Sequence, residues 1–190
     1  DAALADAGEQ AGVREVADAA ALVRRVDAWA RELSLLPIRP DTGEAGALPA
    51  LRALAVQQLL CALRRDAFGA TAINARLEAQ LRKAWKVPAD EAWYAGRAVL
   101  ITRNDYDSGL FNGDVGLCLA DEGGQLRVWF ETVLADGSAS VRSFAPSTLP
   151  AHEGAFAVTI HKSQGSEYAR VAVVLPPDTD NRILSRQLLY

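Results

Sequence analysis

Apolar residues recur at spacings of three and four through the first 35 residues, which predicts an amphipathic helix. The stripe comprises Val13, Val16, Ala20, Val23, Val26, Ala30 and Leu33. Pro37 and Pro40 then end regular structure, and residues 41–49 are expected to be an exposed linker. Residues 1–50 are therefore interpreted as a helical lead-in followed by a linker.

A short apolar run at residues 55–63 predicts a buried strand. The polar residues 64–70 are expected to form a loop after it, and Thr71 is the expected N-cap of a helix. The buried stripe of this helix, which is expected to end near Trp85, comprises Ile73, Leu77 and Leu81. Strand, loop and capped helix are typical of α/β proteins, although this pattern alone does not separate one α/β fold from another.

The pattern changes between residues 97 and 150, where strand-like runs alternate with turn signals rich in glycine and aspartate. The expected strands are residues 98–102, 115–120, 126–131 and 139–144. Closely spaced strands of this kind predict a small antiparallel barrel. Its aromatic residues are expected to form the barrel core rather than platforms for nucleic-acid bases: Phe111, Trp129, Phe130 and Phe144.

Ten residues near the end of the chain, TIHKSQGSEY at 159–168, carry many hydrogen-bonding side chains and one glycine. The strand-like runs 155–158 and 171–175 lie on either side of them. Loops that follow core strands are where α/β proteins place ligand-binding residues. This block is therefore the leading candidate for a functional site.

The block resembles motif V of superfamily 1 DNA helicases, in the form found in RecD-like enzymes. Two upstream segments are also similar to that family. Residues 96–116 resemble the segment that leads into an SH3-like insert, and residues 61–69 with Asn74 resemble the motif IV region. The similar segments extend over residues 55–190 in the order that the family has.

The resemblance implies an α/β fold, namely part of a second RecA-like motor lobe that carries a small SH3-like β-barrel. Residues 51–96 would be the first part of this lobe, with motif IV. Residues 97–150 would be the SH3-like insert, and residues 151–190 the remainder of the lobe with motif V.

The resemblance also implies roles for individual residues. Gly165 and Glu167 would bind nucleotide, with the Glu167 carboxylate on the ribose. The residues that would contact DNA are Arg64, Arg65, Thr159, His161, Lys162, Ser163 and Gln164.

Each assignment has a simpler structural alternative. His161 is also compatible with a hydrogen-bonded histidine at a strand end, Lys162 with a surface salt bridge, and Gly165 with a plain turn. Glu167 would equally suit a helix cap. Arg64 and Arg65 would equally suit a solvated loop, and the resemblance does not say which of them matches the family's arginine.

A phosphate-binding P-loop, G-x-x-x-x-G-K-[ST], is absent, because the only Lys-Ser pair, Lys162-Ser163, follows a histidine. The chain has no methionine and ends at Tyr190, where the family's motif VI arginine would begin. We therefore expect a piece of a longer protein. ATP and Mg²⁺ are expected to bind the parent protein, and no ATP hydrolysis is expected from this piece alone.

Composition changes this picture little. The chain is 50% hydrophobic and 23% charged, with no apolar run long enough for a membrane helix, and we expect a cytoplasmic protein. Cys61 and Cys118 are expected to be small buried hydrophobic residues, and with two histidines no metal site is expected. The net charge is −4, but residues 51–86 are rich in arginine and lysine, which suits either a phosphate contact or a solvated helix face.

The function that the resemblance implies is ATP-driven 5′→3′ translocation on single-stranded DNA. The parent would be the alpha subunit of exodeoxyribonuclease V, beside RecB and RecC, in repair and recombination. The alternatives are a stand-alone RecD-like, Pif1-like or relaxase-associated helicase, and a non-catalytic protein-interaction module. A Ser–His hydrolase is disfavoured, because the chain has no G-x-S-x-G segment.

Overall fold

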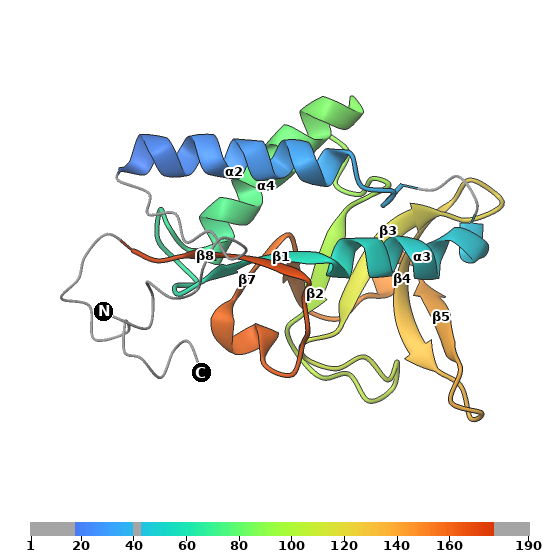
Figure 1. The fold of residues 1–190 in the computed structure, drawn as a ribbon. Helices are drawn as coiled ribbons and strands as arrows, with labels where there is room; N and C mark the ends of the chain where they lie inside the picture. The colour runs from blue at the N-terminus through green and yellow to red at the C-terminus, as the bar shows by residue number, and fades with distance from the viewer. Residues whose placement is uncertain (1–17, 40–42, 177–190) are drawn as a thin grey trace.

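Two β-sheets, three α-helices and two short 3₁₀ helices make up the described residues, 18–39 and 43–176, of the computed structural model (Figure 1). The parallel sheet has the order β7–β1–β8 and comprises β1 (Gln57–Cys61), β7 (Ala157–Thr159) and β8 (Arg170–Val174). The antiparallel sheet has the order β5–β4–β3–β2–β6. Its strands are β2 (Ala98–Ile101), β3 (Val115–Ala120), β4 (Leu126–Val133), β5 (Ala139–Phe144) and β6 (His152–Gly154). The predicted mixed α/β fold is thus confirmed.

Helices α2 (Ala19–Ser34) and α4 (Ala70–Trp85) pack on each other, on one side of the parallel sheet (Figure 1). Asp18 caps α2, since its carboxylate accepts a hydrogen bond from the Ala21 N–H at 2.6 Å. The helix predicted from the first apolar stripe is therefore confirmed over residues 19–34. The part of that prediction at residues 1–17 lies outside the described residues. None of the helices in the described segments is long and apolar enough to cross a membrane.

Helix α3 (Gly43–Ala55) occupies most of the segment where a linker was expected, so the linker prediction is wrong from residue 43 onward. Its buried residues follow a helical spacing: Gly43, Gly46, Ala47, Ala50, Leu51 and Leu54. Most of these side chains are small and give a weak apolar signal. Pro49 lies inside the helix, where it removes a backbone donor. Packing of the stripe against β1, β3, β4 and β5 offsets that cost.

The predicted strand at 55–63 and the helix ending near Trp85 are both confirmed, by β1 and α4. Thr71 is not the N-cap, however, because α4 begins at Ala70 and its N-cap is Gly69. The carbonyls of Leu63 and Arg64 accept hydrogen bonds from the Ala70 and Thr71 N–H groups, at 2.9 and 3.1 Å. The preceding loop thus supplies the acceptors that a capping side chain usually supplies.

The four strands predicted between residues 97 and 150 are confirmed as β2 to β5. A closed barrel is not confirmed, because β5 and β6 form the two edges of an open sheet in the described part of the chain. Strand β6, which the pattern did not indicate, pairs with β2 and brings His152 opposite Ile101. Only Ala155 and Phe156 separate β6 from β7, so one short segment joins the two sheets.

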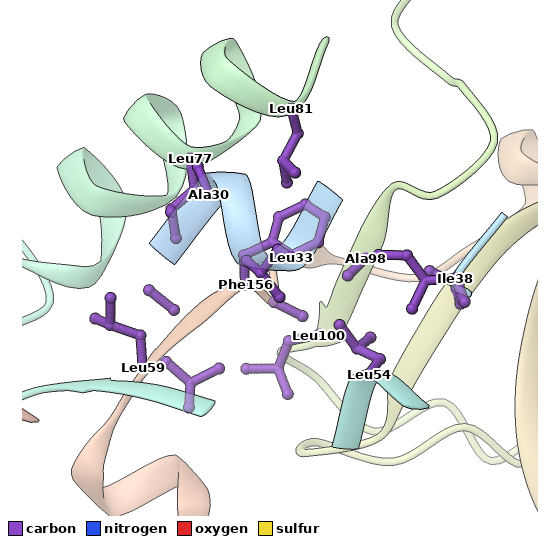
Figure 2. Close-up of a cluster of buried hydrophobic side chains, with 14 of the residues drawn as sticks. Ala30, Leu33, Ile38, Leu54, Leu59, Leu77, Leu81, Ala98, Leu100 and Phe156 are labelled. Atoms are coloured by element: carbon purple, nitrogen blue, oxygen red, sulfur yellow. The ribbon is translucent and has the colours of Figure 1, made fainter. Parts of the chain in front are cut away.

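Successive side chains of β2 point to opposite faces of the sheet, and each face packs against a different hydrophobic cluster. Ala98 and Leu100 face the larger cluster, whereas Val99 and Ile101 face a smaller one, and all four are buried. Figure 2 shows the larger cluster, with Leu77 and Leu81 of α4 gathered with Leu33 of α2 around Phe156. Both sheets and all three helices contribute to this cluster, which holds the elements in fixed relative positions.

Cys61 and Cys118 are free and buried, as predicted, and burial raises the pKa of each thiol to about 12. Trp129 and Phe130 are buried, and Phe144 packs against the smaller cluster. Phe111 differs from the prediction: it is 44% exposed and lies edge-on to Tyr106 at the surface.

Candidate nucleic-acid interface at the carboxyl edge of the parallel sheet

Two loops meet at the carboxyl edge of the parallel sheet because β1 and β7 run in the same direction. Cys61, the last residue of β1, lies opposite Thr159, the last residue of β7. The loop that follows β1 carries Arg64 and Arg65, and the segment that follows β7 carries the polar block. Sheet register therefore places the two sets of predicted site residues side by side.

The loop between β1 and α4 folds back tightly on itself at Gly69. A Cβ atom added there would lie 2.8 Å from the carbonyl oxygen of Arg64, too close for any other residue without a backbone shift. The Gly69 N–H donates to the Asp66 carbonyl at 3.0 Å. Because the Arg64 carbonyl also accepts from Thr71, the Arg64 backbone is fixed while its side chain remains 55% exposed.

The polar block forms a short 3₁₀ helix, η2 (Ile160–Ser163), followed by a turn. The Ser163 hydroxyl donates to the Ile160 carbonyl at 2.7 Å, so it serves the local fold in this state. Gly165 has a φ of +83°, a conformation that favours glycine, and the turn it makes lets the Ser166 N–H reach the Ser163 carbonyl at 3.0 Å. His161, Gln164 and Glu167 project from this segment with exposed side chains.

Glu153 of β6 binds cations from both loops. Its Oε1 atom accepts a hydrogen bond from Lys162 Nζ at 2.9 Å, and its Oε2 atom accepts from Arg64 Nη2 at 3.0 Å and from Nε at 3.3 Å. Glu153 was not predicted from the sequence, because it lies 89 positions from Arg64 and nothing in its local pattern indicates a contact. Lys162 therefore forms a salt bridge, with Glu153, as the structural alternative for this residue predicted.

Two opposing effects act on the Glu153 carboxyl. Burial on its own raises the pKa, but the hydrogen bonds and charges of Lys162 and Arg64 outweigh it and hold the pKa below the ordinary value of 4.5. A lowered carboxyl pKa means that the ionised form is stabilised by folding. This contribution is present above pH 4.5 and is lost as the pH falls through the lowered pKa.

Asn74 fastens α4 to the segment that joins the two sheets. Its Nδ2 group donates to the carbonyls of Ala70, Gly154 and Ala157, and its Oδ1 accepts from the Ala157 N–H at 3.0 Å. The side chain is buried, so it serves the structure rather than a ligand. One sequence signal was available, since Asn74 lies beside Ile73 and three residues before Leu77 on the buried face of the helix.

An open pocket of about 430 Å³ lies beside these residues, between the start of α4 and β6. Its lining includes Arg64, Arg65, Asn74, Glu78 and Glu153. Burial raises the pKa of the Glu78 carboxyl, and the charges of Arg97 and Arg82 only partly counteract it. Glu78 was not among the residues singled out from the sequence.

The predicted site residues are thus only partly brought together. Arg64 and Lys162 share a carboxylate, and Thr159 starts the second loop. Within the described part of the chain no hydrogen bond or ion pair links His161, Gln164 or Glu167 to them. Several cations of the basic stretch 51–86 are paired within the protein and so are less suited to bind phosphate: Arg52 with Glu131, Arg76 with Asp27, and Arg82 with backbone carbonyls.

We expect Asn74→Ala to destabilise the protein by about 2–4 kcal/mol, because it leaves several buried backbone groups without partners. The change is read as a lower midpoint of urea unfolding. Asn112→Ala, which alters an exposed asparagine, is the matched control and should shift the midpoint by much less. Equal shifts in the two variants would contradict the structural role of Asn74.

Glu78→Gln should stabilise the protein at pH 7 and have little effect near pH 4. A raised carboxyl pKa means that folding disfavours the ionised form, so the free energy of unfolding falls as the pH rises through the raised pKa. Glutamine stays neutral and avoids this loss. The measurement is the midpoint of urea unfolding of variant and wild type at both pH values. A lower midpoint for the variant than for the wild type at pH 7 would contradict the prediction.

The sequence comparisons with known proteins point to RecD-type helicases. Residues 154–190 match the family model described as the UvrD-like helicase C-terminal domain. The chain is 38% identical over 135 residues to the RecBCD enzyme subunit RecD of Haemophilus influenzae, a match that covers 70% of this chain and 19% of that protein. It is 39% identical over 141 residues to the RecD subunit of Mycobacterium tuberculosis, covering 74% of this chain and 23% of that protein.

The ATP-dependent RecD2 DNA helicase of Deinococcus radiodurans is 32% identical over 170 residues, covering 86% of this chain and 22% of that protein. Among solved structures, Bacteroides Pif1 helicase in complex with ADP-AlF3 and single-stranded DNA aligns at 15% identity, with a TM-score of 0.36, over 85% of this chain and 44% of that chain. The chain spans about a fifth of the length of the curated relatives it matches. It is therefore a RecD-like segment, similar to the C-terminal part of these helicases.

Proposed function

We propose that this chain forms part of the second motor lobe of an ATP-dependent 5′→3′ DNA helicase, and that the carboxyl edge of its parallel sheet grips single-stranded DNA. One observation carries the proposal. Arg64 and Lys162, from two loops that are distant in sequence, converge on the two oxygens of one carboxylate. A phosphate group presents the same chemistry, so this convergence is suited to a DNA backbone.

The relatives support a motor rather than an interaction module. They include RecD subunits of the RecBCD enzyme, at 28–39% identity over the matched segments, and a helicase named RecD2, at 32% identity. Because most of these relatives are named as RecD subunits, we favour a subunit that assembles with RecB and RecC over the stand-alone type. The open antiparallel sheet then corresponds to the SH3-like insert of residues 97–150, completed at one edge by β6.

Roles are assigned to the polar loops as follows. We take Arg64 rather than Arg65 as the cation of the first loop, because its backbone is fixed and its guanidinium already binds an acid. Gly165 and Glu167 are assigned to the nucleotide, as the family resemblance implies. The residues assigned to DNA in the second loop are Thr159, His161, Lys162, Ser163 and Gln164.

ATP binding would close two motor lobes on each other, and ATP hydrolysis would allow them to reopen, so that the motor moves along DNA. These 190 residues contain no P-loop, so the phosphates and Mg²⁺ would be held mainly by another part of the protein. This segment would provide one wall of the nucleotide cleft and one DNA grip. Contacts with phosphates do not depend on base sequence, which suits a motor that moves along any strand.

The full-length His161→Ala variant should bind single-stranded DNA about ten- to a hundredfold more weakly, because a single hydrogen bond to a charged phosphate is lost. The loss should be the same on oligo-dT and on a mixed sequence. Fluorescence anisotropy with labelled oligonucleotides measures the affinity. The DNA concentration that gives half-maximal ATPase stimulation should rise by the same factor.

Lys83→Ala is the control, because Lys83 is exposed in the last turn of α4, away from the start of α4 where the pocket lies. It removes a positive charge and should leave both measurements nearly unchanged. If His161→Ala has wild-type DNA affinity and wild-type ATPase stimulation while folding normally, the assignment of this loop to DNA is wrong.

A further inference from the structure

Glu153 is paired with both of the cations on which the proposed grip depends. Each carboxylate oxygen takes one partner, Lys162 on Oε1 and Arg64 on Oε2. Lys162 has no other side-chain partner in the described residues, and its side chain is only 22% exposed. In this arrangement an external anion cannot bridge Arg64 and Lys162 unless Glu153 moves out of the place between them.

The geometry of the three groups is that of an anion site with its anion in place. Two oxygens separated by one atom bridge a guanidinium and an ammonium, as two non-bridging oxygens of a phosphodiester would. The Glu153 side chain is 25% exposed and that of Arg64 is 55% exposed, so the cluster lies within reach of a ligand from solvent. The adjoining open pocket, which Arg64 and Glu153 both line, offers space for an incoming backbone.

We propose that Glu153 is a built-in competitor of DNA: its carboxylate occupies the place between Arg64 and Lys162 that a backbone phosphate takes when the strand is gripped. This inference rests on the proposed function and adds a specific residue and a specific consequence to it. Gripping DNA exchanges one anion for another at the same two cations. The displaced carboxylate then lies partly buried without its partners, which is unfavourable.

The consequence is a grip that is weaker than two free cations would give. A translocating motor must release each phosphate as well as bind it, and an internal anion that rebinds the cations favours release. Glu78, which lines the same pocket as Glu153, adds a second acidic group on that side. Exposed Arg65, on the same lining, leaves one cation that Glu153 does not bind.

The test compares Glu153→Gln with Glu131→Gln in the full-length protein. Glu131 makes a surface ion pair with Arg52 at 3.1 Å, so its replacement changes the net charge identically but leaves the site intact. Binding of a labelled oligo-dT is measured by anisotropy over a range of salt concentrations. We expect Glu153→Gln to bind about five- to tenfold more tightly at low salt. The plot of log affinity against log salt concentration should also be steeper, by the amount that release of about one more counterion gives.

Glu131→Gln should change the affinity by about twofold or less, since an exposed charge acts only weakly at a distance. Glu153→Asp is a second variant, which keeps the charge but shortens the side chain so that it no longer reaches both cations. It should also bind more tightly than wild type, by about two- to threefold. If neither Glu153 variant binds oligo-dT more tightly than Glu131→Gln does, the proposal is wrong.

A double variant, Arg64→Ala with Lys162→Ala, separates this inference from the function on which it rests. If the double variant binds DNA as well as wild type, the proposed grip itself is wrong. If the double variant loses affinity and Glu153→Gln gains none, only the role of Glu153 is wrong. Adding Glu153→Gln to the double variant should give no gain, because no cation remains to be released.

Discussion

The segment from His152 to Thr159 belongs to both sheets, and this constraint determines most of the remaining architecture. Strand β6 forms one edge of the antiparallel sheet, and after two residues the chain becomes β7 of the parallel sheet. The bend is held by buried amides, with Asn74 bound to Gly154 and Ala157, and Gln58 Nε2 donating to the carbonyls of Ala155 and Phe156. Buried polar groups that are paired in this way favour one arrangement of the elements around them.

This junction also explains the position of the candidate site. The bend between β6 and β7 leaves Glu153 within hydrogen-bond reach of Arg64 and Lys162, on the loops that follow β1 and β7. An acid from one sheet therefore meets Lys162 and Arg64 from the other. The antiparallel sheet is not merely an appendage on the lobe, since it supplies the anion that sets the charge state of the two cations.

The sequence predicted the regular elements well where apolar side chains are large and periodic. Strands β3 and β5 and the end of α4 were placed at the observed residues. It failed at α3, because glycine and alanine make up most of the buried stripe and give a weak apolar signal. The dense run of hydrogen-bonding side chains located the polar block, the family resemblance assigned its roles, and sheet register then accounts for its neighbour Arg64. The role of Glu153 could not be predicted from the sequence, since its contacts arise only when both sheets are assembled.

The central claim is that one carboxylate couples Arg64 to Lys162, and a double-mutant cycle on single-stranded DNA affinity tests it most directly. With Glu153 present, either alanine variant leaves a single cation that the carboxylate fully neutralises. Each single variant should then lose nearly as much affinity as the double variant. In a Glu153→Gln background the two losses should become additive. Additive losses in both backgrounds would contradict the account, because they would mean that the two cations act on DNA independently of Glu153.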